Sequence, residues 1–166
     1  MAAKHLMERL WVTEAGYPAC VFLVHDGSHR CGYVNVPIDH PLYGVDHDEA
    51  YDRGFGDNIH GGLTYSGDLR LGDGDFDLIV EGNVIRVSQE SPRFWYGFDC
   101  AHFGDEIHYP GKEEILKGIG PPHSPEHWWL EEEVVAECER LALQLKNYVP
   151  EQPNNSVGTS AGPSPP

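Results

Sequence analysis

One amphipathic helix follows a series of short strand-like segments, and this order constrains the fold more than any other feature. The apolar positions of the helix recur at spacings of four and three: Leu130, Val134, Cys138, Leu141 and Leu145. We expect the helix to run from Pro125 to Tyr148, with Ser124 as its N-cap. A helix with a single apolar stripe is stable only when that stripe packs against another element.

The partner of this helix is predicted to be a sheet. The strand candidates are Ala19–Val24, Arg30–Val36, Leu63–Tyr65, Leu78–Val80, Val84–Val87 and Arg93–Phe98. Turns rich in glycine, aspartate and asparagine separate the first two, and likewise the fourth and fifth, as in β-hairpins. Several strands followed by one helix favour an α+β fold with a mostly antiparallel sheet.

The length of 166 residues allows one domain with a substantial core. We assign residues 1–149 to that domain. Residues 150–166 are mostly Pro, Ser, Gly and Asn with a single charged residue, which predicts a disordered tail.

The charge balance restricts the possible partners. Eleven Lys and Arg face 27 Asp and Glu, for a net charge of −16, whereas nucleic acids and anionic membranes require a basic surface. A small anionic ligand stays compatible, because one or two arginines can hold it. The N-terminus does not resemble a secretion signal and no apolar run is long enough to span a bilayer, so we expect a cytoplasmic protein.

Two acidic segments and the cysteines are predicted to be structural. The glutamates between Glu131 and Glu139 are interpreted as a solvated helix face, and Gly72–Asp77 as an acidic turn rather than a calcium loop. The four cysteines form no C-x-x-C pair and are expected to be free, mostly buried thiols. A nucleophilic pair of Cys100 with a histidine is the alternative for that thiol.

The segment Pro37–Gly62 is predicted to be a long irregular loop. Ordinary connections are about 4–6 residues, and long ordered loops are often binding loops. Its candidate ligand-binding residues are His40, Tyr43 and Arg53.

A Gly-Gly pair follows His60 and precedes a strand. Glycines permit a tight turn or a close approach of the backbone to a ligand. We interpret His60, Gly61, Gly62 and the following Tyr65 as ligand-binding candidates, with a tight turn bearing a surface histidine as the alternative.

The aromatic stretch FWYGF runs directly into DCAHFGD. Strand alternation places Trp95 on the opposite face from Tyr96 and Phe98. Asp99, His102 and Asp105 then follow at the strand end and, with His60, are the candidate catalytic residues; Trp95, Asp99 and His102 are also ligand-binding candidates. General-base chemistry, a mixed N/O metal set completed by His60 or His40, and hydrogen bonding around a polar turn all remain open. We predict no bound metal and no cofactor.

Three motifs together resemble a group of small phage and actinobacterial proteins of unassigned activity. These are GYVNVP with HPLYG (residues 32–44), HGGLTYS (60–66) and GFDCAHFGD (97–105). The resemblance implies a viral accessory role.

Three functions are compatible with these features. The first is a small-ligand binding protein that sequesters a nucleotide-derived host immune signal of the cyclic nucleotide or cyclic ADP-ribose type in the host cytosol, with a homo-oligomer as a candidate form. This anti-defence role depends on the resemblance. The second is a hydrolase or phosphodiesterase of such a nucleotide, and the third is an acidic protein that blocks a basic host site. The sequence favours a binding protein over an enzyme.

Overall fold

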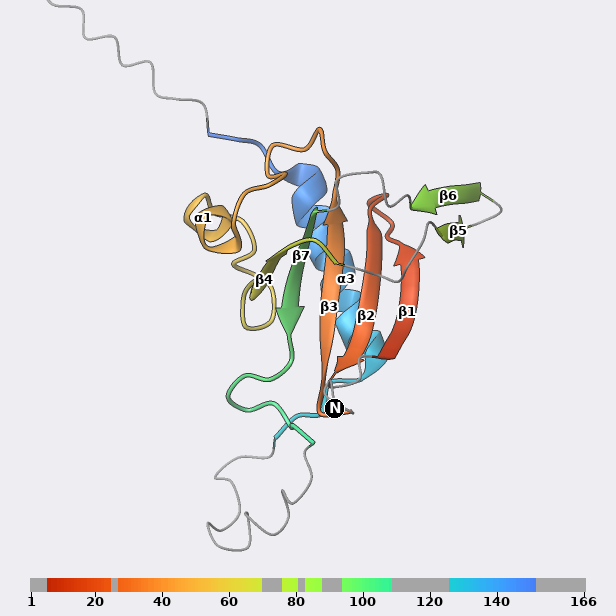
Figure 1. The fold of residues 1–166 in the computed structure, drawn as a ribbon. Coiled ribbons are helices and arrows are strands. Elements are labelled where there is room, and N and C mark those ends of the chain that lie inside the picture. The colour runs from red at the N-terminus through yellow and green to blue at the C-terminus, as the bar shows by residue number, and fades with distance from the viewer. Residues whose placement is uncertain are drawn as a thin grey trace, which may run out of the picture.

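The computed structural model of the chain describes residues 6–24, 27–69, 76–80, 83–87, 94–108 and 126–151, with backbone only for 76–80 and 83–87 (Figure 1). Its strands are β1 (Leu6–Val12), β2 (Pro18–Val24), β3 (His29–Val36), β4 (Tyr65–Gly67), β5 (Phe76–Val80), β6 (Asn83–Val87) and β7 (Phe94–Asp99). Its helices are α1 (His47–Asp52) and α3 (Glu131–Asn147). Elements of both types confirm the predicted α+β class.

Five strands form one antiparallel sheet in the order β1-β2-β3-β7-β4. The β2–β3 hairpin pairs Val24 with His29, as its turn sequence predicts. The predicted second hairpin forms a separate sheet of β5 and β6 and contacts β1 beyond the edge of the main sheet (Figure 1). In the main sheet, β7 lies between β3 and β4, so it is an interior strand. The polar stretch that begins at Asp99 lies at the C-terminal end of β7.

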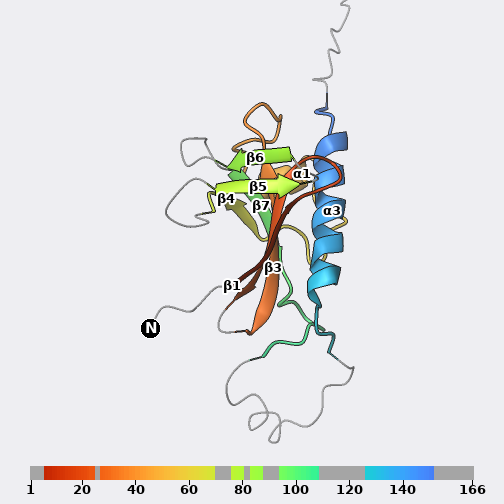
Figure 2. The ribbon, with the colours of Figure 1, turned by 90° about the vertical axis from the view of Figure 1, so that its right-hand side faces the viewer.

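Helix α3 covers one face of the sheet (Figure 2). The predicted alternation of β7 is confirmed, because Tyr96 and Phe98 join the core shared with the helix. Gly32 on β3 permits this close packing: a Cβ atom there would lie 2.5 Å from Phe98 Cζ and 2.7 Å from Cys138 Sγ. The helix is therefore fixed against the centre of the sheet.

The start of the C-terminal helix differs from the prediction. The helix begins at Glu131 instead of Pro125; Ser124 and Pro125 themselves lie outside the described residues. The preceding segment instead pairs with the chain after β7: His127 N–H donates to Gly104 O at 2.9 Å, and Glu106 N–H donates to His127 O at 2.8 Å. These tertiary hydrogen bonds replace the helical ones and keep residues 126–130 non-helical.

The N-terminal half also departs from the sequence expectations. The strand β1 was not predicted, and the strand expected at Leu63–Tyr65 begins at Tyr65. The segment Pro37–Gly62 contains α1, and it contributes buried side chains to the core: Leu42, Ala50, Phe55 and Ile59. Much of this segment is therefore a packed part of the domain and not an irregular loop.

Some predictions fall on residues that the structure does not describe. These are the turn residues His25 and Asp26, residues 72–75 of the acidic turn, and the tail from residue 152 onward. All four cysteines are buried and free of disulfides. In the described part of the chain, no helix has the length and apolar character needed to cross a membrane.

Candidate functional site

Asp105 lies at the centre of a cluster of polar and aromatic side chains at one end of the sheet. Its carboxylate is buried, with 6% of the residue exposed. One oxygen, Oδ2, accepts hydrogen bonds from His60 Nε2 and from the backbone N–H of His102, both at 2.8 Å. The other, Oδ1, accepts one from Trp129 Nε1 at 2.8 Å. Three separate chain segments therefore converge on one carboxylate.

A tight turn after β7 brings Asp105 to this position. Its backbone N–H donates to His102 O at 2.9 Å, and Gly104 adopts a φ of 93°, which favours glycine. The backbone bridge to His127 then holds the turn against the segment that leads into α3. The local sequence thus sets the turn, and tertiary pairing sets its position.

Asp105 is ionised at neutral pH. Burial by itself would raise the pKa of this carboxyl, but the hydrogen bonds from His60, His102 and Trp129 stabilise the charged form and bring the pKa below its usual 3.8. The cluster therefore holds a buried negative charge.

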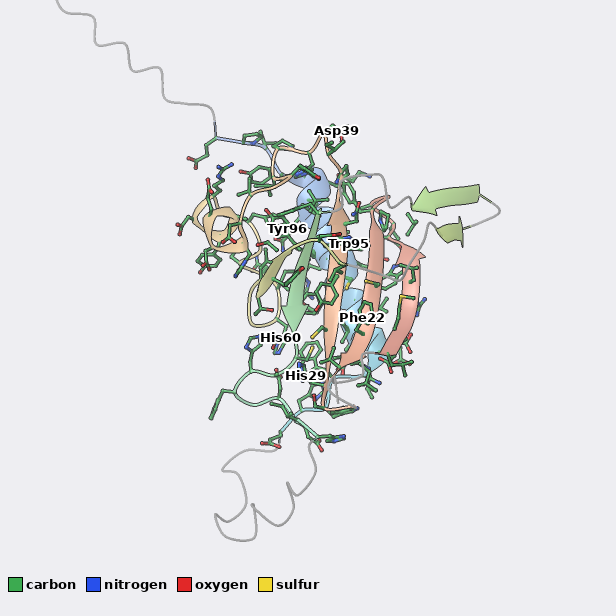
Figure 3. All side chains as sticks on the ribbon, viewed as in Figure 1. Phe22, His29, Asp39, His60, Trp95 and Tyr96 are labelled. Carbon is green, nitrogen blue, oxygen red and sulfur yellow. The ribbon has the colours of Figure 1, made fainter. Side chains whose placement is uncertain are left out.

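His60 is fixed from three directions. Because ionised Asp105 only accepts hydrogen bonds, Nε2 of His60 carries the proton and Nδ1 is the basic nitrogen of the neutral ring. The ring lies against Trp129, with centroids 4.2 Å apart. The backbone N–H of His60 donates to Glu137 Oε2 at 3.0 Å. This leaves His60 oriented but accessible, with 24% of its side chain exposed at the end of β7 (Figure 3).

His102 is the second imidazole of the cluster. Its ring centroid lies 5.4 Å from that of His60. Its Nε2 atom is buried and lies 3.5 Å from Asp99 Oδ1 without a hydrogen bond to it. That Asp99 oxygen accepts the N–H of Ala101 at 3.0 Å. The four predicted catalytic candidates therefore lie close together: His60 is hydrogen-bonded to Asp105, and His102 lies beside Asp99 without a hydrogen bond.

Gly61 allows the two histidines to approach each other. Its φ is 65°, and a Cβ atom there would lie 1.9 Å from His102 Nε2. The next residue, Gly62, also has a positive φ of 77°, but nothing lies within 4 Å of its Cβ position. The Gly-Gly pair therefore serves two purposes: both residues permit the turn, and only the first makes room for His102.

This difference gives a matched prediction. Gly62→Ala should lower the free energy of unfolding by about 1 kcal/mol, the conformational cost of positive φ. Gly61→Ala should cost about 2–4 kcal/mol, because the displacement of His102 is added. Urea denaturation of both variants measures the difference. Equal losses in the two variants would contradict the predicted contact.

Two predicted ligand-binding residues have structural roles elsewhere. His40 donates from Nε2 to Leu145 O at 2.8 Å and accepts the N–H of Leu42 at Nδ1, so both of its ring nitrogens are engaged. It lies next to Asp39, at the other end of the sheet from His60 (Figure 3). Tyr43 packs against Phe94, with centroids 5.6 Å apart.

The remaining ligand-binding candidates, two aromatic residues and one arginine, also lie apart from the cluster. Trp95 is completely buried and is not part of the core under α3. Tyr65 packs against Tyr33, and its hydroxyl donates to Asp68 O at 2.6 Å. Arg53 lies in the loop after α1 and lines a groove beside α3. The structure therefore separates the predicted stacking residues from the histidines.

Two cluster residues carry no sequence signal for this site. The sequence predicts Trp129 within the helix, whereas in the structure it precedes the helix and contacts both Asp105 and His60. The sequence predicts Glu137 on the solvated helix face, yet only 6% of it is exposed, and it accepts the His60 N–H. Its position two turns into the helix, within a run of glutamates, gave no local signal of burial.

Neither a cysteine nucleophile nor a metal site is supported at this cluster. Cys100 is buried, and burial raises the pKa of its thiol, so a thiolate nucleophile is disfavoured there. The ligand atoms of His60, Asp99, His102 and Asp105 do not gather within 4.8 Å of one another in groups of three or more. Among the described residues, that criterion is met by Asp46, His47 and Asp48 in and before α1.

Comparison of the chain with protein-family models, with curated proteins and with solved structures finds no match. The fold and the cluster define an α+β protein with a histidine–aspartate site.

Proposed function

We propose that the protein is a hydrolase that acts on a small nucleotide-like ligand by general acid–base catalysis at His60 and His102. The observation that carries this proposal is the 2.8 Å hydrogen bond from His60 Nε2 to ionised Asp105. A carboxylate in this position fixes the orientation of an imidazole and stabilises its protonated form. It also leaves the Nδ1 atom of His60 available as a base.

The proton transfers follow from this arrangement. His60 Nδ1 takes a proton from water as the water oxygen attacks the phosphorus atom of the ligand. The bond to the leaving oxygen breaks, and protonated His102 donates the proton of Nδ1 to that oxygen, because its Nε2 atom is buried. The ring separation of 5.4 Å allows both imidazoles to act on one group. General acid–base catalysis of this kind typically contributes a factor of about 10²–10⁴ to the rate.

The charge of the protein favours a small ligand over a polymer. A net charge of −16 repels an extended polyanion, whereas a single phosphate group needs only local donors. The two imidazoles supply such donors when they are protonated.

Sequestration of an intact nucleotide is the alternative use of the same site, and the phage resemblance favours it. The acidic blocking role receives less support, because several carboxylates of α3 are engaged within the fold. Glu137 is buried, Glu139 accepts hydrogen bonds from Trp11 Nε1 and Glu14 N–H, and Glu133 pairs with His127.

The test is incubation of the purified protein with a panel of linear and cyclic nucleotides, followed by heat denaturation and chromatography of the supernatant. Hydrolysis predicts conversion of at least one nucleotide to a product. Recovery of a bound nucleotide intact would replace the hydrolase with a sequestering protein. Absence of both uptake and turnover across the panel would contradict both functions.

A further inference from the structure

A groove with a volume of about 990 Å³ runs beside the C-terminal half of α3. One wall is the loop that follows α1, from Arg53 to Asn58, and the other is the face of α3 from Arg140 to Asn147 with the residues that follow the helix. Small-molecule sites typically have volumes of about 300–1,000 Å³. The groove is therefore large enough for a ligand of nucleotide size.

The two walls are tied together by hydrogen bonds. Gln144 Oε1 on the helix accepts the backbone N–H of Gly56 in the loop at 3.1 Å. Arg140 also reaches across and donates to Asn58 O at 3.4 Å. These contacts hold the groove open in one shape, which reduces the entropy that a ligand would lose on ordering it.

Each wall contributes one arginine. The side chains of Arg53 and Arg140 are 43% and 56% exposed. Each is oriented by a glutamate outside the groove walls, Arg53 by Glu49 and Arg140 by Glu137. A guanidinium has five N–H donors, so a carboxylate partner leaves others for a ligand. The two arginines lie on facing walls of one groove, in a chain with eleven basic and 27 acidic residues.

The groove also offers apolar contact surface. Leu143 on the helix and Val149 after it line the groove and are 53% and 78% exposed. Asp57 and Glu151 also line it, which disfavours a ligand with many negative charges. A ligand with one phosphate group and one apolar portion matches this combination best.

We infer that this groove binds a small organic phosphate, with Arg53 and Arg140 on the phosphate and Leu143 on the apolar portion. Guanidinium groups bind phosphate through paired, charge-assisted hydrogen bonds, which makes arginine better suited to this role than lysine. This site is distinct from the imidazoles of the His60 cluster and does not require the protein to be a hydrolase.

Isothermal titration calorimetry with phenylphosphonate tests the inference. This probe carries an aromatic ring and a phosphonate with a carbon–phosphorus bond, so phosphoester hydrolysis cannot affect the result. We expect saturable binding to the wild-type chain, weakened at least tenfold in Arg53→Gln. Arg140→Gln should weaken binding similarly. Because that change removes the partner of buried Glu137, Arg53→Gln decides the matter if Arg140→Gln fails to fold.

A matched control locates the site. Arg9→Gln removes an arginine of similar exposure, 48%, that lies 3.8 Å from Glu131 on another part of the surface, and should leave the affinity unchanged. The inference is overturned if the wild-type chain shows no saturable binding, if Arg53→Gln binds the probe as tightly as the wild type, or if Arg9→Gln weakens binding as much as Arg53→Gln.

Discussion

Asp105→Asn is expected to lower the free energy of unfolding by about 3 kcal/mol at pH 7, although the substitution hardly changes the volume of the side chain. Ionised Asp105 accepts hydrogen bonds from His60, His102 and Trp129. An asparagine keeps one acceptor oxygen and turns an N–H₂ group towards a donor that the carboxylate had satisfied. Urea denaturation measures the loss.

An exposed carboxylate provides the control for this prediction. Asp48→Ala removes a carboxylate whose side chain is 93% exposed and should change the free energy of unfolding by no more than about 0.5 kcal/mol.

The stabilisation by Asp105 should also depend on pH. The pKa of Asp105 is lower in the folded chain than its usual 3.8, so the ionised form stabilises the fold above that value. This stabilisation is lost as the pH falls through the folded pKa. The gap between wild type and Asp105→Asn should therefore narrow below about pH 4. A gap that stays the same from pH 7 to pH 2.5 would show that the charge of Asp105 is not the cause.

His60→Gln is expected to reduce turnover by about 10²–10⁴ while the protein stays folded. The amide nitrogen of glutamine can take the place of the imidazole Nε2 and keep the hydrogen bond to Asp105, but glutamine has no basic atom in the place of Nδ1. The measurement is the rate of product formation on whichever nucleotide of the panel the wild type converts, together with a thermal melt of the variant.

His47→Gln is the matched control for this change. The side chain of His47 is 27% exposed, against 24% for His60, and its Nδ1 atom lies 2.9 Å from Ser66 Oγ. His47→Gln should keep full turnover. A His60→Gln variant as active as the wild type would remove His60 from the mechanism, and an equal loss in both variants would point to a general effect of losing a histidine.

The parts of the fold that could be predicted are those specified by local pattern. The β2–β3 hairpin and the alternation of β7 follow from period-two hydrophobicity and turn residues. The strand β1 lacks that signal, because Glu8 and Arg9 interrupt its apolar residues and its pairing with β2 is irregular between Met7 and Arg9. The helix α1 has only six residues, too few for an apolar period to emerge.

The helix start shows tertiary contacts overriding a local signal. Ser124-Pro125-Glu126 is a favourable helix N-terminus, but Trp129 bonds to Asp105 and its carbonyl accepts Arg30 Nη1 at 2.7 Å. The helix then begins after Leu130, whose N–H donates to Glu133 Oε2 at 2.8 Å. No pattern within residues 124–130 contains the information about these distant partners.

The candidate site was predictable in part for the same reason. His60 stands before a Gly-Gly turn, and Asp99, His102 and Asp105 stand at a strand end, so each belongs to a recognisable local pattern. Trp129 and Glu137 enter the cluster only because α3 lies across the sheet at one particular position. The long segment offered His40 and Tyr43 as equal candidates, and only the packed structure separates them from the histidine cluster.

The hydrogen bond between His60 and Asp105 is the basis of the proposed catalysis, and proton NMR in water measures it most directly. We expect a downfield imidazole N–H signal that exchanges slowly with solvent at neutral pH, that is assigned to Nε2 of His60, and that is missing from the spectrum of His60→Gln. A folded wild-type protein without this signal, or with the signal unchanged in His60→Gln, would contradict the arrangement of His60 on Asp105.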